Sequence, residues 1–182
     1  LVALLGSEDG FAALSAARSL GEYGAEAVAA LHALWPRLDT DDTGFRERFA
    51  AAIARVAAHA PDRLVGTWAE GRASLRVGLL HVIEATDDPP PAWRALLRQA
   101  LEDPHPDVRA RAAAQLAAQG EPGMLPVLLL GFRSEDGETR TLATAALAHV
   151  GRDAAHLLPE MLERLGDEET LWHPGAAAHG RT

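Results

Sequence analysis

An apolar residue recurs every 30 to 33 residues, each time a few positions before a break rich in Gly or Pro. The spacings of these anchor residues are 33, 30, 33 and 31, and the anchors are Leu20, Ile53, Ile83, Leu116 and Leu147. Such a period fits one pair of short helices, which cannot bury its apolar faces alone. The sequence therefore predicts side-by-side stacking of helical hairpins around one continuous core.

Each unit follows the same order. An acidic turn such as Asp39–Asp42 comes first and supplies residues suited to a helix N-cap. An Ala-rich first helix, a Gly or Pro break and a second helix richer in Leu and Trp follow. We place the hairpins near 7–36, 39–70, 71–101, 102–132 and 133–165, as one repeat domain over residues 1–169. Residues 1–5 are interpreted as the end of a preceding helix, and 170–182 as a frayed tail or a truncated sixth repeat.

The composition supports helices packed through small side chains. Apolar residues make up 48% of the chain, mostly Ala and Leu, and only Ile53 and Ile83 are isoleucines. Aromatic residues make up 5%, and runs of β-branched residues are nearly absent. These properties favour an all-α fold over a β fold.

The charge and the cysteine content exclude several classes of function. The chain has no cysteine, which excludes disulfides, thiolate metal sites and cysteine nucleophiles. All 17 basic residues are Arg, which we interpret as the codon bias of a bacterial genome. The net charge of −9 disfavours non-specific nucleic-acid binding, and no apolar run reaches the length of a membrane span. We expect a cytoplasmic protein, and the start without Met suggests a piece of a longer one.

An arginine stands seven residues before four of the five anchors. The members of this arginine column are Arg46, Arg76, Arg109 and Arg140, while the first unit has Ala13. In the last two units an acidic residue lies two positions earlier, as Asp107 and Glu138. The column could serve a repeated contact between hairpins, or it could present a row of guanidinium groups to an anionic ligand. A repeating residue more often serves the repeating contact.

The segment DPHPDVR at residues 103–109, with the Ala-rich run and Gly120 behind it, closely resembles the consensus of HEAT repeats. The short period is nearest to the phycobilisome-lyase HEAT-like variety. The resemblance implies an all-α, right-handed α-solenoid (superhelix) of about five HEAT-like helical hairpins. It also implies a structural ladder between neighbouring hairpins, made by Arg46, Arg76, Asp107, Arg109, Glu138 and Arg140.

The resemblance further implies a concave surface lined by the second helices. Trp35 and Trp68 both lie fifteen residues after their anchors, so they occupy equivalent places on successive second helices. Tryptophan is frequent in binding hot spots, but it also packs well inside a core, and the sequence leaves both interpretations open. The segment from Met124 to Phe132 carries no charge, which indicates either full burial or a face for a partner. The candidate partner-binding residues are Trp35, Trp68, Arg94, Arg98, Leu128, Phe132 and Arg164.

Catalytic and metal-binding patterns are missing from the sequence. It has no phosphate-binding Gly-rich loop, no HExxH motif and no Gly-x-Ser-x-Gly elbow. The HEAT-like deoxyhypusine hydroxylase holds iron with His-Glu dipeptides, and this chain has none. His81 with Glu84 is the closest approach and has no second copy. We therefore expect no metal and no cofactor.

The sequence thus predicts a non-catalytic scaffold that binds another protein or peptide on a concave surface. Two alternatives stay open. One is an alkylpurine DNA glycosylase-type enzyme, because such enzymes use HEAT-like repeats with tryptophan in the groove. The other is an accessory to a cofactor-attaching lyase. Fold alone does not separate these functions.

Overall fold

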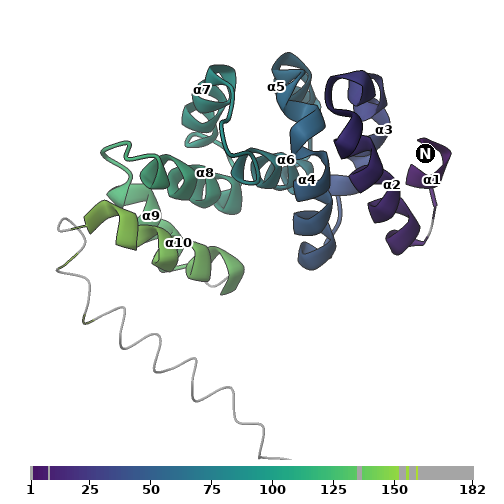
Figure 1. Cartoon of the computed structure of the whole chain (residues 1–182). Coiled ribbons are helices and arrows are strands. Elements are labelled where there is room, and N and C mark those ends of the chain that lie inside the picture. The colour runs from purple at the N-terminus through teal and green to yellow at the C-terminus, as the bar shows by residue number, and fades with distance from the viewer. Residues whose placement is uncertain (1, 8, 135–136, 152–154, 156–158, 160–182) are drawn as a thin grey trace, which may run out of the picture.

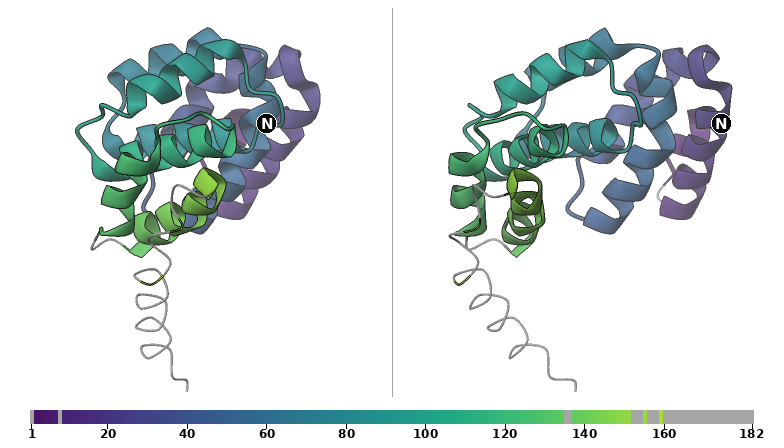
Figure 2. Two further views of the ribbon diagram at one scale, coloured as in Figure 1. Left: turned by 90° about the vertical axis from the view of Figure 1, so that its left-hand side faces the viewer. Right: turned by 60° about the vertical axis from the view of Figure 1, so that its left-hand side comes forward.

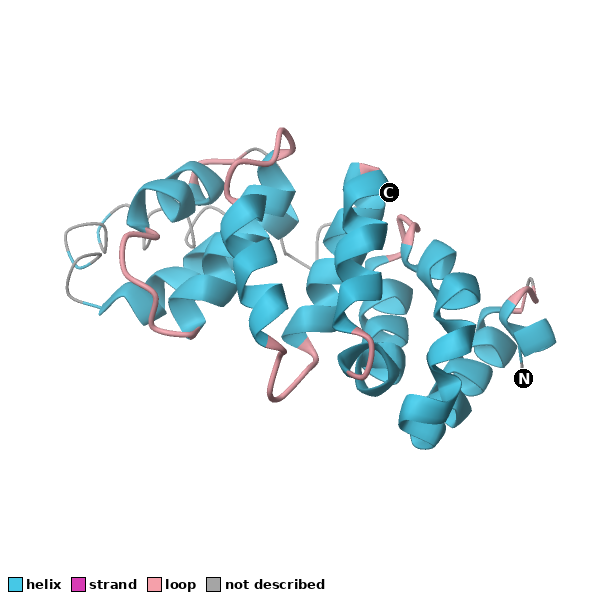
Figure 3. Cartoon of the chain, turned by 90° about the horizontal axis from the view of Figure 1, so that it is seen from above, coloured by secondary structure: helices cyan, strands magenta, loops and turns pink. Residues whose placement is uncertain are grey.

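The computed structural model describes residues 2–7, 9–134, 137–151, 155 and 159, and no strand occurs among them. Helices joined by short loops make up this part of the chain (Figure 3). The helices are α1 (Val2–Leu5), α2 (Gly10–Tyr23), η1 (Gly24–Ala30), α3 (Leu31–Leu34), η2 (Trp35–Leu38), α4 (Thr43–Ala58), α5 (Pro61–Glu70), α6 (Ala73–Glu84), α7 (Pro91–Ala100), α8 (Pro106–Ala118), α9 (Leu125–Phe132) and α10 (Gly137–Val150).

The helices form two layers. The first layer consists of α2, α4, α6, α8 and α10, and each of these helices packs against the next. The second layer holds the segment from η1 to η2, then α5, α7 and α9, each following its partner in the first layer (Figure 1). The residues expected to form a helix after α10 lie largely outside the described residues. The described chain is therefore a row of helix pairs, as the repeat predicts.

Local sequence explains where the helices begin. The Asp9 carboxylate accepts a hydrogen bond from the Phe11 backbone N–H at 2.9 Å, and that of Asp42 accepts one from the Phe45 N–H at 2.8 Å. These side chains cap α2 and α4 by satisfying an unpaired amide of the first turn. Proline stands in the first turn of α5, α7 and α8, where its missing N–H costs no helical hydrogen bond.

The second half of the first pair is irregular. In place of a regular second helix it has fifteen residues split into η1, α3 and η2, with tighter 3₁₀ turns at both ends. Pro36 lies in η2 and cannot donate a backbone hydrogen bond there. The segment still buries Leu31, Leu34 and Leu38 completely. Packing of these leucines fixes the segment in place without a regular helix.

Small residues allow the first-layer helices to approach closely. A Cβ atom added to Gly21 would lie 2.5 Å from the Ala52 carbonyl oxygen of α4. One added to Gly78 would lie 2.6 Å from the Leu38 Cβ and 2.9 Å from its carbonyl oxygen. The Gly21 contact joins the first helix pair to the second, and the Gly78 contact joins the first pair to the third, so glycine sets the spacing at these places.

No helix among residues 2–7, 9–134 and 137–151 combines the length and the apolar character needed to cross a membrane.

Candidate functional site

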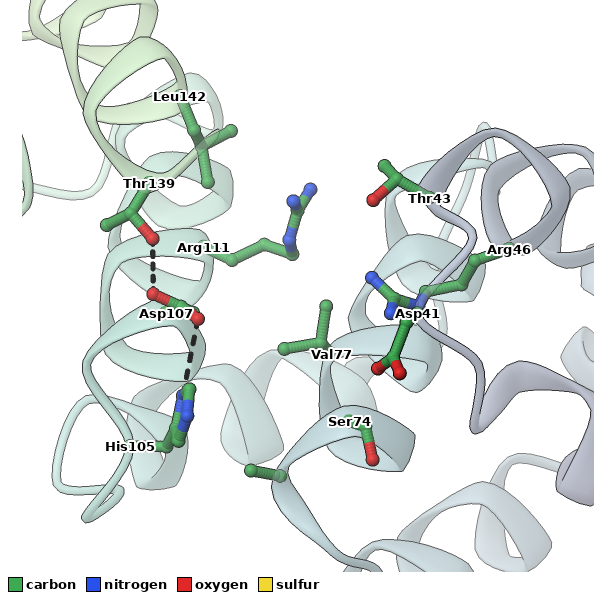
Figure 4. Close-up of a pocket in the computed structure, with 11 residues that line it drawn as sticks. Asp41, Thr43, Arg46, Ser74, Val77, His105, Asp107, Arg111, Thr139 and Leu142 are labelled. Carbon is green, nitrogen blue, oxygen red and sulfur yellow. Dashed lines mark hydrogen bonds and ion pairs between the residues drawn. The ribbon is translucent and has the colours of Figure 1, made fainter. Parts of the chain in front are cut away.

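A pocket of about 260 Å³ opens on the first layer. It draws residues from four successive first helices, namely α4, α6, α8 and α10, and from the turns before α4 and α8 (Figure 4). The lining residues are Asp41, Thr43, Arg46, Ala73, Ser74, Val77, His105, Asp107, Arg111, Thr139 and Leu142. Most of them lie in the first two turns of their helices, so the pocket lies at the N-terminal ends of the layer.

The pocket shows which way the array bends. Helices α4 and α10 are separated by two other first helices, yet both reach the same pocket. Two further views show the ends of α4 and α10 on the same side of α6 and α8 (Figure 2). The first layer therefore lies on the inside of the bend. This corrects the expectation of a concave surface lined by the second helices.

Two arginines give the pocket its cationic groups. Arg46 of α4 is 7% exposed and Arg111 of α8 is 6% exposed, and Arg111 extends from its helix into the pocket. The Arg46 Nη2 donates to the carbonyl oxygen of Thr40, while its buried Nε has no hydrogen-bond acceptor among the described residues. The Arg111 Nη1 lies 3.4 Å from an oxygen of Glu84. Both guanidinium groups are thus held in place by this chain.

His81 of α6 is a buried neutral base near these arginines. Burial, together with the smaller effects of the Arg111 and Arg46 charges, lowers its pKa from an ordinary 6.5 to about 3. Its Nδ1 lies 3.8 Å from the Glu84 carboxylate, and its Nε2 has no hydrogen-bond partner among the described residues. A His81 with this pKa is uncharged near pH 7.

The carboxylates around the pocket are bound by neighbouring repeats. Asp107 accepts a hydrogen bond from the Thr139 hydroxyl of the next first helix and lies 3.5 Å from His105. Asp39 accepts from the Ser74 hydroxyl and from Arg72, and these contacts lower the pKa of Asp39 against the opposing effect of its burial. These hydrogen bonds tie each turn to the following hairpin.

The arginine column binds backbone carbonyls. Arg109 Nη1 donates to the carbonyl oxygens of Asp103 at 2.7 Å and Pro104 at 2.9 Å. Arg140 donates to Ser134 at 2.8 Å, and Arg46 donates to Thr40, each six residues earlier. The column therefore fixes the turn that precedes its own helix.

Arg76 extends this pattern to the next repeat. Its Nη1 donates to Gly71 O at 2.5 Å, and its Nε lies 2.8 Å from the buried Asp103 carboxylate. Asp103 lies in the turn whose carbonyl Arg109 binds. Arg76, Asp103 and Arg109 thus form a continuous link between two hairpins. The side chain of Glu138 lies outside the described part of the structure.

Trp35, Trp68 and Trp93 lie in the core. Trp35 and Trp68 are each 5% exposed, and Trp35 is among the residues that line a hollow with Thr67 and Leu75. Trp93 is fully buried and its indole N–H donates to the Pro61 carbonyl, at 3.3 Å. Since the second layer is not on the inside of the bend, Trp35 and Trp68 do not face the concave surface proposed for them.

Two further candidates from the second layer are also buried. Leu128 and Phe132 of α9 have almost no exposed surface. The uncharged helix is explained by packing, because α9 contacts both α8 and α10. Leu130 on the same helix is 68% exposed and was not among the candidates.

Arg94 and Arg98 are committed to an ion pair. Arg98 forms a two-bond contact with Glu121, at 2.6 and 2.8 Å, and the Arg94 Nε lies 3.4 Å from the same carboxylate. This contact lowers the pKa of Glu121 and raises that of Arg98. It holds the loop before α9 against α7. Arg164 lies outside the described residues.

Sequence reasoning placed its partner-binding candidates on the second layer and did not name most of the residues that line the pocket. The overlooked residues include Ser74, Val77, Arg111 and Leu142. Arg111 and Leu142 both stand five residues before their anchors, so a shared register position was available as a signal. Among the described residues, no group of three or more His, Asp or Glu side chains is arranged to hold a metal ion.

We compared the sequence with models of known protein families, and one family matched. The model of HEAT repeats matches residues 70–148 and again residues 94–173, which together cover more than half of the chain. The chain belongs to the HEAT-repeat family. No curated protein and no solved structure matches the chain. The HEAT match includes α6 to α10, so three of the four helices around the pocket belong to matched repeats.

Proposed function

We propose that this HEAT-repeat chain is an interaction module that binds a segment of another protein along the inside of its bend. The observation that carries the proposal is the pocket shared by α4, α6, α8 and α10. HEAT repeats generally mediate interactions between proteins. A surface built from four helices, each packed against the next, is held in shape before binding, so little conformational entropy is lost when a partner docks.

The finer architecture remains part of the proposal. We propose a right-handed array of about five hairpins within one domain over residues 1–169, of the short, phycobilisome-lyase HEAT-like variety. The period of 30 to 33 residues supports the short variety. We further propose a non-catalytic scaffold of the bacterial cytoplasm. The two tryptophans on which the glycosylase alternative depended are core residues, and this favours protein binding.

The test is to fill the pocket without disturbing the core. Ala73 lines the pocket at the start of α6, and Ala95 is exposed on α7 in the other layer. We compare the wild type with Ala73→Trp and with the control Ala95→Trp, each immobilised and exposed to lysate of the source organism. Captured proteins are identified by mass spectrometry, and circular dichroism checks that each variant is folded.

We expect one or more proteins to be retained by the wild type and by Ala95→Trp and to be lost by Ala73→Trp. Equal retention by all three baits would contradict docking in the bend. Retention of the wild type's partner by Ala73→Trp together with its loss by Ala95→Trp would place binding on the second layer.

A further inference from the structure

The strongest unassigned chemistry in the molecule is the pair of buried arginines in the pocket. Arg46 and Arg111 come from helices on opposite sides of α6, and each is more than nine-tenths buried. The Nε of Arg46 is buried without a hydrogen-bond acceptor in the described part of the chain. A guanidinium group has five N–H donors and no acceptor, so a carboxylate is its best-matched ligand.

The surrounding backbone adds to this preference. Helices α4, α6, α8 and α10 all begin beside the pocket, and each has at least twelve residues. Their N-terminal ends carry partial positive charge, which favours an anion. Arg111 and Arg46 both lower the pKa of the nearby His81, in addition to the larger effect of its burial.

The acidic residues in the lining have partners within the chain or face solvent, and Glu84, outside the lining, forms an ion pair with Arg111. Asp107 is already bound to the Thr139 hydroxyl and to His105 of its own turn. Asp41 is exposed, and solvent screens its effect on the pocket interior. The chain as a whole carries a net charge of −9, which repels polyanions at long range. The pocket therefore suits one acidic side chain within a neutral or basic segment, and it does not suit nucleic acid.

The size and the apolar part of the lining are consistent with such a side chain. A volume of about 260 Å³ takes a single side chain with its neighbouring backbone. Ala73, Val77 and Leu142 supply the apolar wall of the pocket. Methylene groups of an acidic side chain would lie against this wall while the carboxylate reaches the arginines.

We infer that the pocket is a carboxylate-binding site, in which Arg46 and Arg111 hold the acidic side chain of a docked protein segment. This inference rests on the proposed function, because it names the chemistry by which the bend recognises its partner. It assigns Arg111 a binding role that its neighbour Arg109, bonded to the turn before α8, does not have.

The direct test uses a matched pair of small probes. N-acetylglutamate α-amide carries one side-chain carboxylate, and N-acetylglutamine α-amide is its neutral isostere. Each is titrated at millimolar concentration into the ¹⁵N-labelled protein, and the Nε–Hε signals of Arg46 and Arg111 are followed by NMR. We expect the glutamate probe alone to shift both signals, and we expect Arg111→Gln to weaken its affinity by about tenfold.

Two further variants keep the test valid if Arg111→Gln fails to fold. Ala73→Glu places a competing carboxylate in the pocket lining, and Ala95→Glu adds the same charge to exposed α7. We expect the first to abolish the probe's effect and the second to leave it unchanged. Absence of any shift, or equal shifts with both probes, would overturn the inference. Tighter binding of a twelve-residue oligothymidylate that Ala73→Glu abolishes would also overturn it, in favour of nucleic acid.

Failure of this inference is separable from failure of the proposed function. A protein that is lost by Ala73→Trp but still binds when Arg111 is replaced by Gln would support docking in the bend and refute the carboxylate contact. Equal capture of that protein by all baits would refute docking itself.

Discussion

At the scale of single residues, the arginine column shows how one side chain organises a turn. Arg46, Arg109 and Arg140 each reach back six residues to a backbone carbonyl, and Arg76 reaches back five. These carbonyls lie outside the helices, where they have no helical hydrogen-bond partner. A charged donor satisfies such an acceptor more strongly than a neutral one. In these four repeats an arginine of the first helix thus fixes the turn that precedes that helix.

Replacing Arg109 tests the contribution of this contact. Arg109→Gln removes hydrogen bonds to two carbonyl oxygens, and we expect the free energy of unfolding to fall by about 1–3 kcal/mol. The measurement is urea denaturation followed by circular dichroism. Arg48→Gln is the control, because Arg48 is exposed and bonds only a carbonyl within its own helix. A loss no larger than that of the control would refute the role assigned to the column.

His81 makes the stability depend on pH. Its pKa is about 3 in the folded chain and near 6.5 when unfolded, so between these values the unfolded chain binds the extra proton. The stabilisation is complete above pH 6.5 and is lost as the pH falls toward 3. We expect wild-type stability to fall more steeply than that of His81→Gln below pH 6.5, by up to about 1.4 kcal/mol per pH unit. Parallel curves from urea denaturation at pH 7, 6 and 5 would contradict a neutral buried His81.

At the scale of helices, close approach depends on glycine. Gly78 of α6 faces Leu38 of η2, and a methyl group there would meet both its Cβ and its carbonyl oxygen. Gly66 of α5 also stands inside a helix, but a Cβ added to it meets no atom within 4 Å. The two glycines have the same chemical identity and opposite structural roles.

These roles predict opposite effects of one substitution. Gly78→Ala forces α6 and η2 apart, and we expect it to destabilise the protein by about 1–3 kcal/mol. Gly66→Ala restricts only the unfolded chain, and we expect it to stabilise the protein by about 0.5–1 kcal/mol. Thermal unfolding of both variants measures the difference. A neutral or stabilising Gly78→Ala would show that the two elements are less tightly packed than described.

At the scale of the whole molecule, the stability of each helix depends on how many neighbouring helices pack against it. Helices α6 and α8 have a first helix on each side, whereas α1 is four residues long and packs mainly against α2 and α3. In a linear array each repeat is stabilised by the interfaces it shares. Interior helices should therefore open less often than terminal ones.

Hydrogen exchange measures this gradient. We expect amides of α6 and α8 to exchange most slowly and those of α1 to exchange fastest, by mass spectrometry of peptic fragments. Equal protection along the whole chain would indicate a single cooperative unit instead of an array of repeats.

The sequence by itself determined the repeat, the helical class and the position of the arginine column. Each depends on local spacing: anchors such as Leu116 and Leu147 recur with the period of a hairpin, and caps such as Asp42 act within a few residues. Only the tertiary structure decided which layer lies inside the bend. That direction depends on how each repeat is rotated against the next, which is set by interdigitating side chains at contacts such as Gly78 with Leu38. For the same reason Trp35 became a core residue and Arg111 a pocket residue, although both are equally visible in the sequence.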